Sequence, residues 1–168
     1  MAAVTITYAT PATITISPQN IATSSDWTAG VESDAIDNTT NKYIDALVSG
    51  KWTCGTTPTI NTTCAVYVYA QHDDTPTYQD VFDGTASAET VTSSGVLSGV
   101  VRFLGAMSLS TTTSDRAYFL APTSVAALFG GILPKRWGIF VAHNTGVNSN
   151  TTAGNHEWKY TGIKYDVT

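Results

Sequence analysis

The side chains that could do chemistry are few and widely spaced in this sequence. The three histidines, His72, His143 and His156, lie far apart, and no Gly-X-Ser-X-Gly elbow, His-Glu-X-X-His helix or phosphate-binding loop is present. Acidic residues gather between residues 73 and 89, but their spacing does not match an EF-hand loop. Nothing places a carboxyl group in the apolar pocket that a glycosidase acid needs. We therefore expect a solvated acidic loop, no catalytic residue, no metal site and no cofactor, and we interpret the protein as a non-enzyme.

Two cysteines, Cys54 and Cys64, flank a loop-like stretch between two strand-like runs. A disulfide there could close the mouth of a hairpin and stabilise the fold by about 2–3 kcal/mol. The alternative is a pair of small buried thiols in a protein made in a reducing cytosol. Because no further cysteines or clustered histidines accompany them, the two thiols do not indicate a zinc site.

The aromatic residues permit a second kind of site. Four tryptophans and eight tyrosines could form a platform on which sugars stack. However, Trp52, Trp137 and Trp158 fall inside strand-like runs, so we expect them to pack in or against a β-sandwich.

The composition indicates a β-rich structural protein. Threonine supplies about one residue in six, whereas Asp, Glu, Lys and Arg together supply only 12%, about half the usual charged share. Thr is β-branched and favours strands. A net charge of −5 without clustered Lys and Arg argues against a nucleic-acid partner, and no run of about 20 apolar residues indicates a membrane partner. The first eight residues alternate like a strand and do not resemble a signal peptide.

Strand-like runs recur along the chain between clusters of Gly, Pro, Asn, Asp and Ser. About eight runs predict an all-β fold, a single antiparallel β-sandwich of jelly-roll type, with an immunoglobulin-like sandwich as the alternative. One short helix is predicted near residues 122–129, between a proline and a glycine. Alternation along residues 100–110 predicts that Phe103 faces the core. The main runs are residues 43–53, 64–71, 100–110, 116–120, 136–143 and 157–167.

The first part of the chain differs in kind from the rest, because it is rich in Thr, Ala and Ser and poor in bulky side chains. We predict an N-terminal extension or arm at residues 1–40 and a β-sandwich domain at residues 41–168. Apolar residues at alternate positions of this arm could pair with a neighbouring subunit by strand addition, although they could equally form an ordinary first strand of the sandwich. Two tyrosines on one side of a later run predict a face covered by a loop or by a neighbouring subunit. The candidate intersubunit contacts are Val4, Ile6, Tyr8, Ile14, Ile16, Tyr67 and Tyr69.

Three further segments are informative, namely residues 45–51 (DALVSGK), 80–85 (DVFDGT) and 128–138 (LFGGILPKRWG). They resemble segments of small virion proteins encoded by tailed bacteriophages, some of which look like capsid decoration (cement) proteins. The resemblance implies a structural protein of the virion, made in the bacterial host cytoplasm, that binds the outer capsid shell and stabilises it. Its implied partners are the major capsid protein and copies of itself, as a homotrimer. The alternative function is a fibre-associated or host-surface glycan-binding module of the virion, and a hydrolase on a jelly-roll scaffold ranks last.

Overall fold

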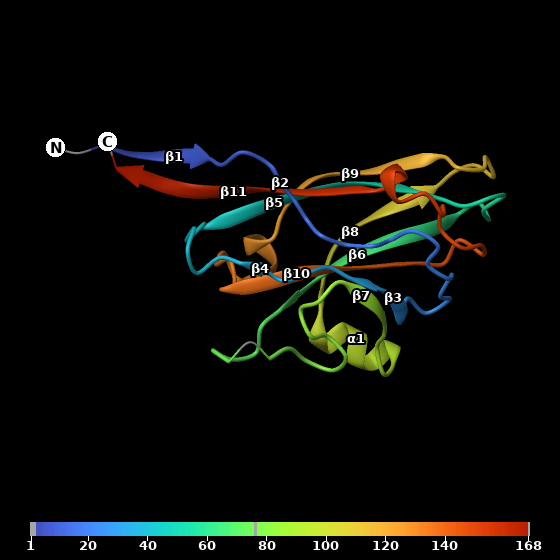
Figure 1. The fold of residues 1–168 in the computed structure, drawn as a ribbon, viewed down its shortest axis with the longest axis horizontal. Coiled ribbons are helices and arrows are strands. Elements are labelled where there is room, and N and C mark those ends of the chain that lie inside the picture. The colour runs from blue at the N-terminus through green and yellow to red at the C-terminus, as the bar shows by residue number, and fades with distance from the viewer. Residues whose placement is uncertain (1–2, 76, 168) are drawn as a thin grey trace.

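Two antiparallel β-sheets packed face to face form the protein in the computed structural model, which describes residues 3–75 and 77–167 (Figure 1). Sheet A has the order β1-β11-β5-β9, with β2 also paired to β11, and sheet B has the order β7-β3-β10-β6-β8, with β4 also paired to β10. The strands of sheet A are β1 (Val4–Tyr8), β2 (Ala12–Thr13), β5 (Asp45–Thr53), β9 (Ala117–Ser124) and β11 (Glu157–Val167). Those of sheet B are β3 (Ala29–Glu32), β4 (Ile36–Asp37), β6 (Thr62–Ala70), β7 (Ser87–Thr90), β8 (Arg102–Leu109) and β10 (Arg136–His143).

The order of the strands is that of a jelly roll. Along the chain, β2, β5, β9 and β11 of sheet A alternate with β3, β6, β8 and β10 of sheet B, except that β6 and β8 follow one another within one sheet. The chain therefore crosses repeatedly between the two layers. This arrangement confirms the predicted fold class, an antiparallel β-sandwich.

The main core lies between the two sheets and is built from the inward-facing half of each strand. On β5 the alternation places Val48 and Trp52 inward, and both are fully buried. Trp158 on β11, the neighbour of β5 in sheet A, and Trp137 on β10 of sheet B belong to the same core. These three tryptophans are therefore core residues, as expected, and do not form a platform for sugars.

A second, smaller core covers the outer face of sheet B. It joins Tyr69 and Phe140 on the sheet to Phe82, Leu97 and other apolar residues from the connection between β6 and β8. This connection, which we call the cover, includes β7 and the helix α1 (Ser94–Val100), and it lies below sheet B in Figure 1. The central strand β10 is therefore buried on both faces, which explains why it reads as a nearly continuous apolar run.

The helices differ from the prediction in place and type. The segment predicted to be helical near residues 122–129 continues β9 to Ser124 and then forms only a 3-10 turn, η1 (Ala126–Phe129). The one α-helix among the described residues, α1, lies instead in the polar middle of the chain, where none was expected. The hydroxyl of Ser93 caps it by accepting a hydrogen bond from the backbone N–H of Val96 (3.2 Å). A further short 3-10 turn, η2 (Ala153–Asn155), precedes β11.

A β-bulge reverses the expected orientation of Phe103. The register between β6 and β8 shifts between Val66 and Tyr67, so that Gly105 lies opposite Val66 but Phe103 lies opposite Tyr67. Leu104 is the extra residue, and it points into the core while Phe103 is 55% exposed. The prediction that Phe103 faces the core is therefore wrong, because strict alternation does not continue through a bulge.

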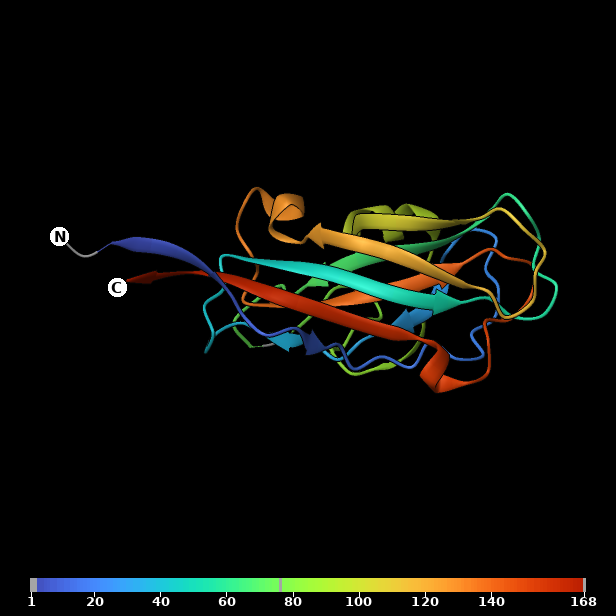
Figure 2. The ribbon, with the colours of Figure 1, turned by 90° about the horizontal axis from the view of Figure 1, so that it is seen from above.

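Most of residues 1–40 belong to the sandwich and do not form a separate arm. β3 lies inside sheet B between β7 and β10, and its residues Val31 and Glu32 are fully buried. Ile14 is also buried in the main core, and its backbone N–H donates to the carbonyl of Trp158 (2.9 Å). Within residues 3–40 only β1 projects from the body, so the projecting part of the N-terminal stretch is much shorter than predicted (Figure 2).

Candidate interaction surface

A two-stranded ribbon projects from one end of the sandwich (Figures 1 and 2). It consists of β1 and the end of β11, paired from Tyr8 opposite Ile163 to Val4 opposite Val167. β5 pairs with β11 only as far as Asp45 opposite Ile163, so no third strand accompanies the ribbon beyond that point. We call β1 and the part of β11 opposite it the ribbon.

One face of the ribbon is apolar and the other is polar. Residues directly opposite each other in an antiparallel pair project from the same face, so the register sorts the side chains into two sets. The polar set is Thr5, Thr7, Lys164 and Asp166. The apolar set, which we call the apolar face, is Val4, Ile6, Tyr8, Ile163, Tyr165 and Val167. All of the apolar set except Ile163 are exposed, with exposed fractions between 57% and 67%.

The apolar face lies on the side of sheet A that points away from the core. Within the body, β11 turns Trp158 inward and Glu157 and Lys159 outward. The same alternation, continued into the ribbon, places Lys164 on the inward side and Tyr165 on the outward side. Along β11 the apolar side chains therefore point inward in the body and outward in the ribbon. The sandwich cannot bury the apolar face with its own core.

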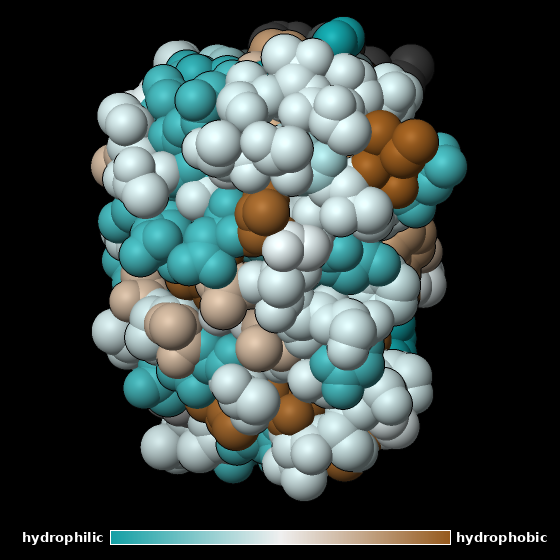
Figure 3. Space-filling model, turned by 90° about the vertical axis from the view of Figure 1, so that its right-hand side faces the viewer, coloured by the Kyte–Doolittle hydropathy of each residue, from teal (hydrophilic) through white to brown (hydrophobic). Residues whose placement is uncertain are grey.

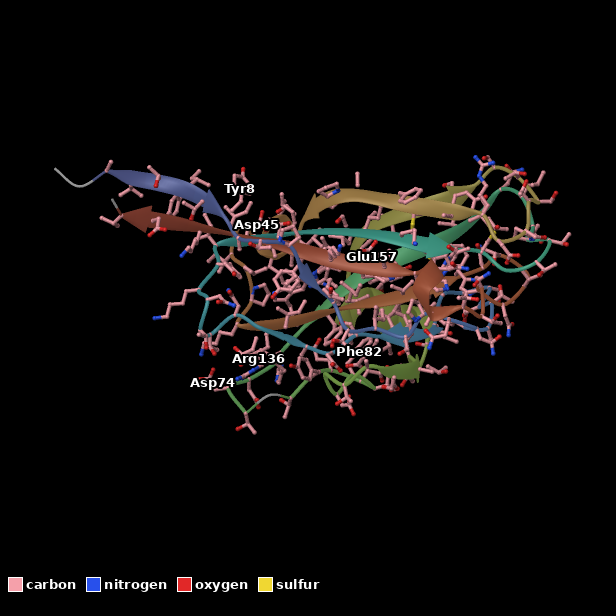
Figure 4. The ribbon with its side chains drawn as sticks, turned by 45° about the horizontal axis from the view of Figure 1, so that its top comes forward. Tyr8, Asp45, Asp74, Phe82, Arg136 and Glu157 are labelled. Carbon is pink, nitrogen blue, oxygen red and sulfur yellow. The ribbon has the colours of Figure 1, made fainter. Side chains whose placement is uncertain are left out.

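The ribbon end differs from the opposite end of the sandwich. Figure 3 shows that opposite end, where hydrophilic and neutral residues dominate and hydrophobic ones are scattered. In Figure 4, Tyr8 stands on the outer side of sheet A where the ribbon leaves the body, and Phe82 lies on the other side of the sandwich under sheet B. Other large apolar side chains are exposed singly on different elements, namely Ile60, Phe103, Phe119 and Ile132, whereas the ribbon gathers five of them on one pair of strands.

Both long edges of the ribbon are open. The backbone N–H of Ala9 donates to the carbonyl of Gly162 (2.8 Å), so Ala9 is a hydrogen-bonded position of the pair formed by β1 and β11. Such positions alternate along β1 with positions that do not bond to β11. Ile6 is one of the latter, and its N–H and C=O therefore point to the outer edge. On the other strand, Ile163 accepts a hydrogen bond on the β5 side (2.8 Å), so Tyr165 directs its backbone groups to that same side, beyond the end of β5. No strand among the described residues lies along either edge.

Tyr67 and Tyr69 lie under the chain's own cover, so a loop and not a neighbouring subunit accounts for their apolar face. Tyr69 is 1% exposed, donates its hydroxyl to the carbonyl of Ser33 (2.6 Å) and stacks on Phe82 with a centroid distance of 4.9 Å. Gly138 lies against the Tyr69 ring, where a Cβ atom would collide with it. Because Tyr69 is buried within its own chain, the prediction that it contacts another subunit is wrong. Tyr67 is only half-buried, so for Tyr67 the contact stays a prediction.

The N-terminal candidates divide into two groups. Ile14 lies in the main core and Ile16 is half-buried against it, so neither is available to a neighbouring subunit. Val4, Ile6 and Tyr8 are exposed on the ribbon. The structure thus brings three of the predicted contact residues together on one face and adds Ile163, Tyr165 and Val167 from β11, which the sequence did not single out. The alternating Ile-Lys-Tyr-Asp-Val letters of residues 163–167 are the signal that could have identified them.

A buried glutamate holds the cover in place. The carboxylate of Glu32 is fully buried and accepts hydrogen bonds from the backbone N–H groups of Gly84 (2.6 Å) and Asp83 (3.2 Å). Burial raises the pKa of this carboxyl group to about 7, and the two N–H donors oppose the shift. Nothing in the sequence pattern distinguishes Glu32 from a surface glutamate, because its burial depends on a loop fifty residues away in the chain.

The acidic residues of the cover have local structural partners. Asp80 accepts from the N–H (2.9 Å) and the hydroxyl (2.6 Å) of Thr92, and Asp74 pairs with Lys135 at the surface. These hydrogen bonds lower the pKa values of Asp80 and Asp74. In the described part of the chain, no group of three or more His, Cys, Asp or Glu side chains could hold a metal ion.

Two of the histidines are buried and hydrogen-bonded near the end of the sandwich opposite the ribbon. His143 bonds to the carbonyl of Ile21 (3.1 Å) and the hydroxyl of Thr145 (3.0 Å), and burial lowers its pKa to about 4. His156 accepts from the N–H of Thr53 through Nδ1 (3.3 Å), which places its proton on Nε2, and burial lowers its pKa as well. Burial therefore favours the neutral form of both rings, which connect strands to loops.

Cys54 and Cys64 are both buried free thiols. Cys64 lies on β6 in sheet B, whereas Cys54 follows β5 of sheet A, so the loop between them crosses from one sheet to the other and does not close a hairpin. Burial raises the pKa of both thiols. The structure therefore contains two buried thiols and no disulfide between them.

Comparison with known protein families, with curated proteins and with solved structures finds no match for this chain. None of the helices in the described residues has the length and apolar character needed to cross a membrane.

Proposed function

We propose that this protein is a structural component of a tailed-bacteriophage virion, where it binds the outer capsid shell as a decoration protein. The resemblance of residues 45–51, 80–85 and 128–138 to such virion proteins motivates the proposal. Its capsid partner is the major capsid protein, and its role is mechanical and not enzymatic.

The observation that best supports this proposal is the ribbon. A rigid, closely packed body with an exposed apolar projection suits a protein that must hold on to neighbouring molecules. The apolar face, which stays in water in the isolated chain, offers adhesion through burial at about 25 cal/mol per Å². Repetition of the same contact over a symmetric shell would strengthen a weak individual attachment.

The candidate glycan-binding function has a narrower basis. Its tryptophan platform is buried, and the aromatic rings exposed on the ribbon are Tyr8 and Tyr165, which project from its two strands. A glycan array with the full chain tests this alternative, and we expect no glycan to bind.

The experiment that tests the main proposal is electron microscopy of intact particles. We expect density for the sandwich at regular positions on the outer shell, and loss of the protein should leave shells that break at lower temperature. Density confined to the tail or to fibres would contradict a decoration role and favour the fibre-associated module.

A further inference from the structure

We propose that three copies of this chain associate through their ribbons around a threefold axis. In this arrangement the apolar faces point inward, and the open edge of β1 in each copy pairs with the open edge of β11 in the next copy. The inference deepens the proposed function and rests on it in treating the ribbon as a contact surface.

The ribbon needs a partner on physical grounds. A two-stranded hairpin without a covered face is marginal in water, yet this ribbon extends beyond the body with an apolar face turned away from its own core. The exposed fractions of its side chains correspond to about 600 Å² of accessible surface per copy. Three copies would together withdraw about 1,800 Å² from water, which is about 600 Å² for each pair of neighbours and less than the roughly 1,200–2,000 Å² of a standard pairwise interface. The backbone hydrogen bonds along the paired edges therefore have to supply part of the stability of the ring.

The two open edges identify the partner as another copy of the chain. β1 and β11 run antiparallel, so rotation of one copy onto the next places the edge of β1 beside the edge of the neighbour's β11 in the antiparallel sense. Each copy then donates one edge and receives another, and the closed ring leaves no edge unpaired. A flat capsid surface could cover the apolar face, but it would leave these backbone groups open.

The number three follows from the width of the enclosed space. Six strands about 4.8 Å apart enclose a space about 10 Å across, which is the separation at which two sheet faces pack their side chains together. Two copies would supply only four strands, which enclose a space about 6 Å across and too narrow for the apolar side chains. The polar set, with Lys164 and Asp166 in a loose ion pair, would lie on the outside of the ring in water.

The test uses two variants of the full chain that add the same charge on opposite faces of the ribbon. Ile6→Asp places a carboxylate on the apolar face, and Thr7→Asp places one on the polar face of the same strand. We expect the unmodified chain to sediment at three times 17.8 kDa at about 10 μM, Thr7→Asp to do the same, and Ile6→Asp to associate at least about 100-fold more weakly. A monomer or dimer for the unmodified chain at about 100 μM, or equal effects of the two variants, would overturn the proposal.

Amide hydrogen exchange separates edge pairing from face packing alone. The N–H groups of Ile6, Tyr8 and Tyr165 point to the open edges, so we expect them to exchange slowly in the unmodified chain and rapidly in Ile6→Asp. A trimer in which these three amides exchange freely would overturn the paired ring.

The outcomes also separate this inference from the proposed function. A trimer that binds no capsid shell contradicts the decoration role and leaves the self-association intact. An unmodified chain that remains monomeric but decorates shells contradicts the self-association and leaves the decoration role intact.

Discussion

The outer face of sheet B and the outer face of the ribbon are both apolar, but only the first is covered by the chain itself. On sheet B, Tyr69 and Phe140 are buried beneath Phe82 and Leu97 of the cover. On the ribbon, Ile6 and its apolar neighbours stay exposed, because the ribbon extends past the end of β5 and has only two strands.

The two faces show that an outward-facing apolar pattern predicts a cover but not its source. In sheet B the long connection between β6 and β8 returns over the strand it has just left, so the cover is intramolecular. The ribbon has no such connection beside it among the described residues. An apolar face of this kind is accordingly a surface to test for intermolecular contacts.

Removing a large side chain from the cover should have the largest effect on folding. Phe82→Ala deletes a ring that is 4% exposed and stacked on Tyr69, so we expect the free energy of unfolding to fall by about 3–5 kcal/mol. The matched control is Phe119→Ala on the outer face of sheet A, where the ring is 71% exposed and the expected loss is below about 1 kcal/mol. Urea denaturation measures both, and equal losses would contradict the contrast between the covered and uncovered faces.

Glu32 should make the cover sensitive to pH. Its pKa in the folded chain, about 7, lies above the ordinary value of 4.5, so its contribution to stability is lost as pH rises from 4.5 to 7. This loss amounts to about 3 kcal/mol. We expect Glu32→Gln to remove this dependence, since a neutral amide of the same shape can still accept from Gly84.

Urea denaturation of both proteins at pH 4.5 and pH 7.5 tests the role of Glu32. From pH 4.5 to pH 7.5 the free energy of unfolding of Glu32→Gln should rise by about 3 kcal/mol relative to that of the unmodified chain, because only the unmodified chain loses the contribution of Glu32. A parallel pH dependence in the two proteins would show that Glu32 does not titrate in this range.

The buried histidine should act in the opposite direction. Because the pKa of His143 falls to about 4 from its ordinary 6.5, its contribution to stability is lost as pH falls from 6.5 to 4. In the unmodified chain this loss offsets the gain from Glu32, so we expect stability to change by less than about 1–2 kcal/mol between pH 4.5 and 6.5.

Glu32→Gln isolates the histidine effect. Without the compensating glutamate, we expect this variant to lose about 2–3 kcal/mol as pH falls from 6.5 to 4.5, with His156 contributing in the same direction. Thermal unfolding over this pH interval gives the measurement. A flat profile for the variant would mean that neither histidine is protonated on unfolding.

Removing the first strand of the ribbon should have the smallest effect on the body. Deletion of residues 1–9 removes Val4, Ile6 and Tyr8, which are exposed, and retains Ile14, which is in the core. We expect the free energy of unfolding of the monomeric chain to change by less than about 1 kcal/mol. Denaturation at a concentration where sedimentation shows a monomer is the measurement, and unfolding of the shortened chain would place β1 among the elements the body requires.

Strand positions could largely be predicted from the sequence, whereas helices and side-chain environments could not. The bounds expected for β10 and the end of the chain, residues 136–143 and 157–167, coincide with the observed strands because apolar or alternating runs there are bounded by turn residues. α1 was missed because its sequence contains two glycines and two valines in seven residues, and its stability comes from packing Leu97 into the cover. β3 was missed because its small residues Ala29 and Gly30 give no strand signal by themselves.

Composition and period-two alternation are local properties of the chain, and they were enough to predict the fold class and to mark Val4, Ile6 and Tyr8 as candidate contact residues. Which apolar faces are covered depends on how distant segments pack. Tyr69 and Tyr8 carry the same kind of signal, but one lies beneath a loop distant in the chain and the other on a ribbon beyond the end of the sheet. Burial depends on contacts between distant segments, and such contacts leave no pattern in the local sequence.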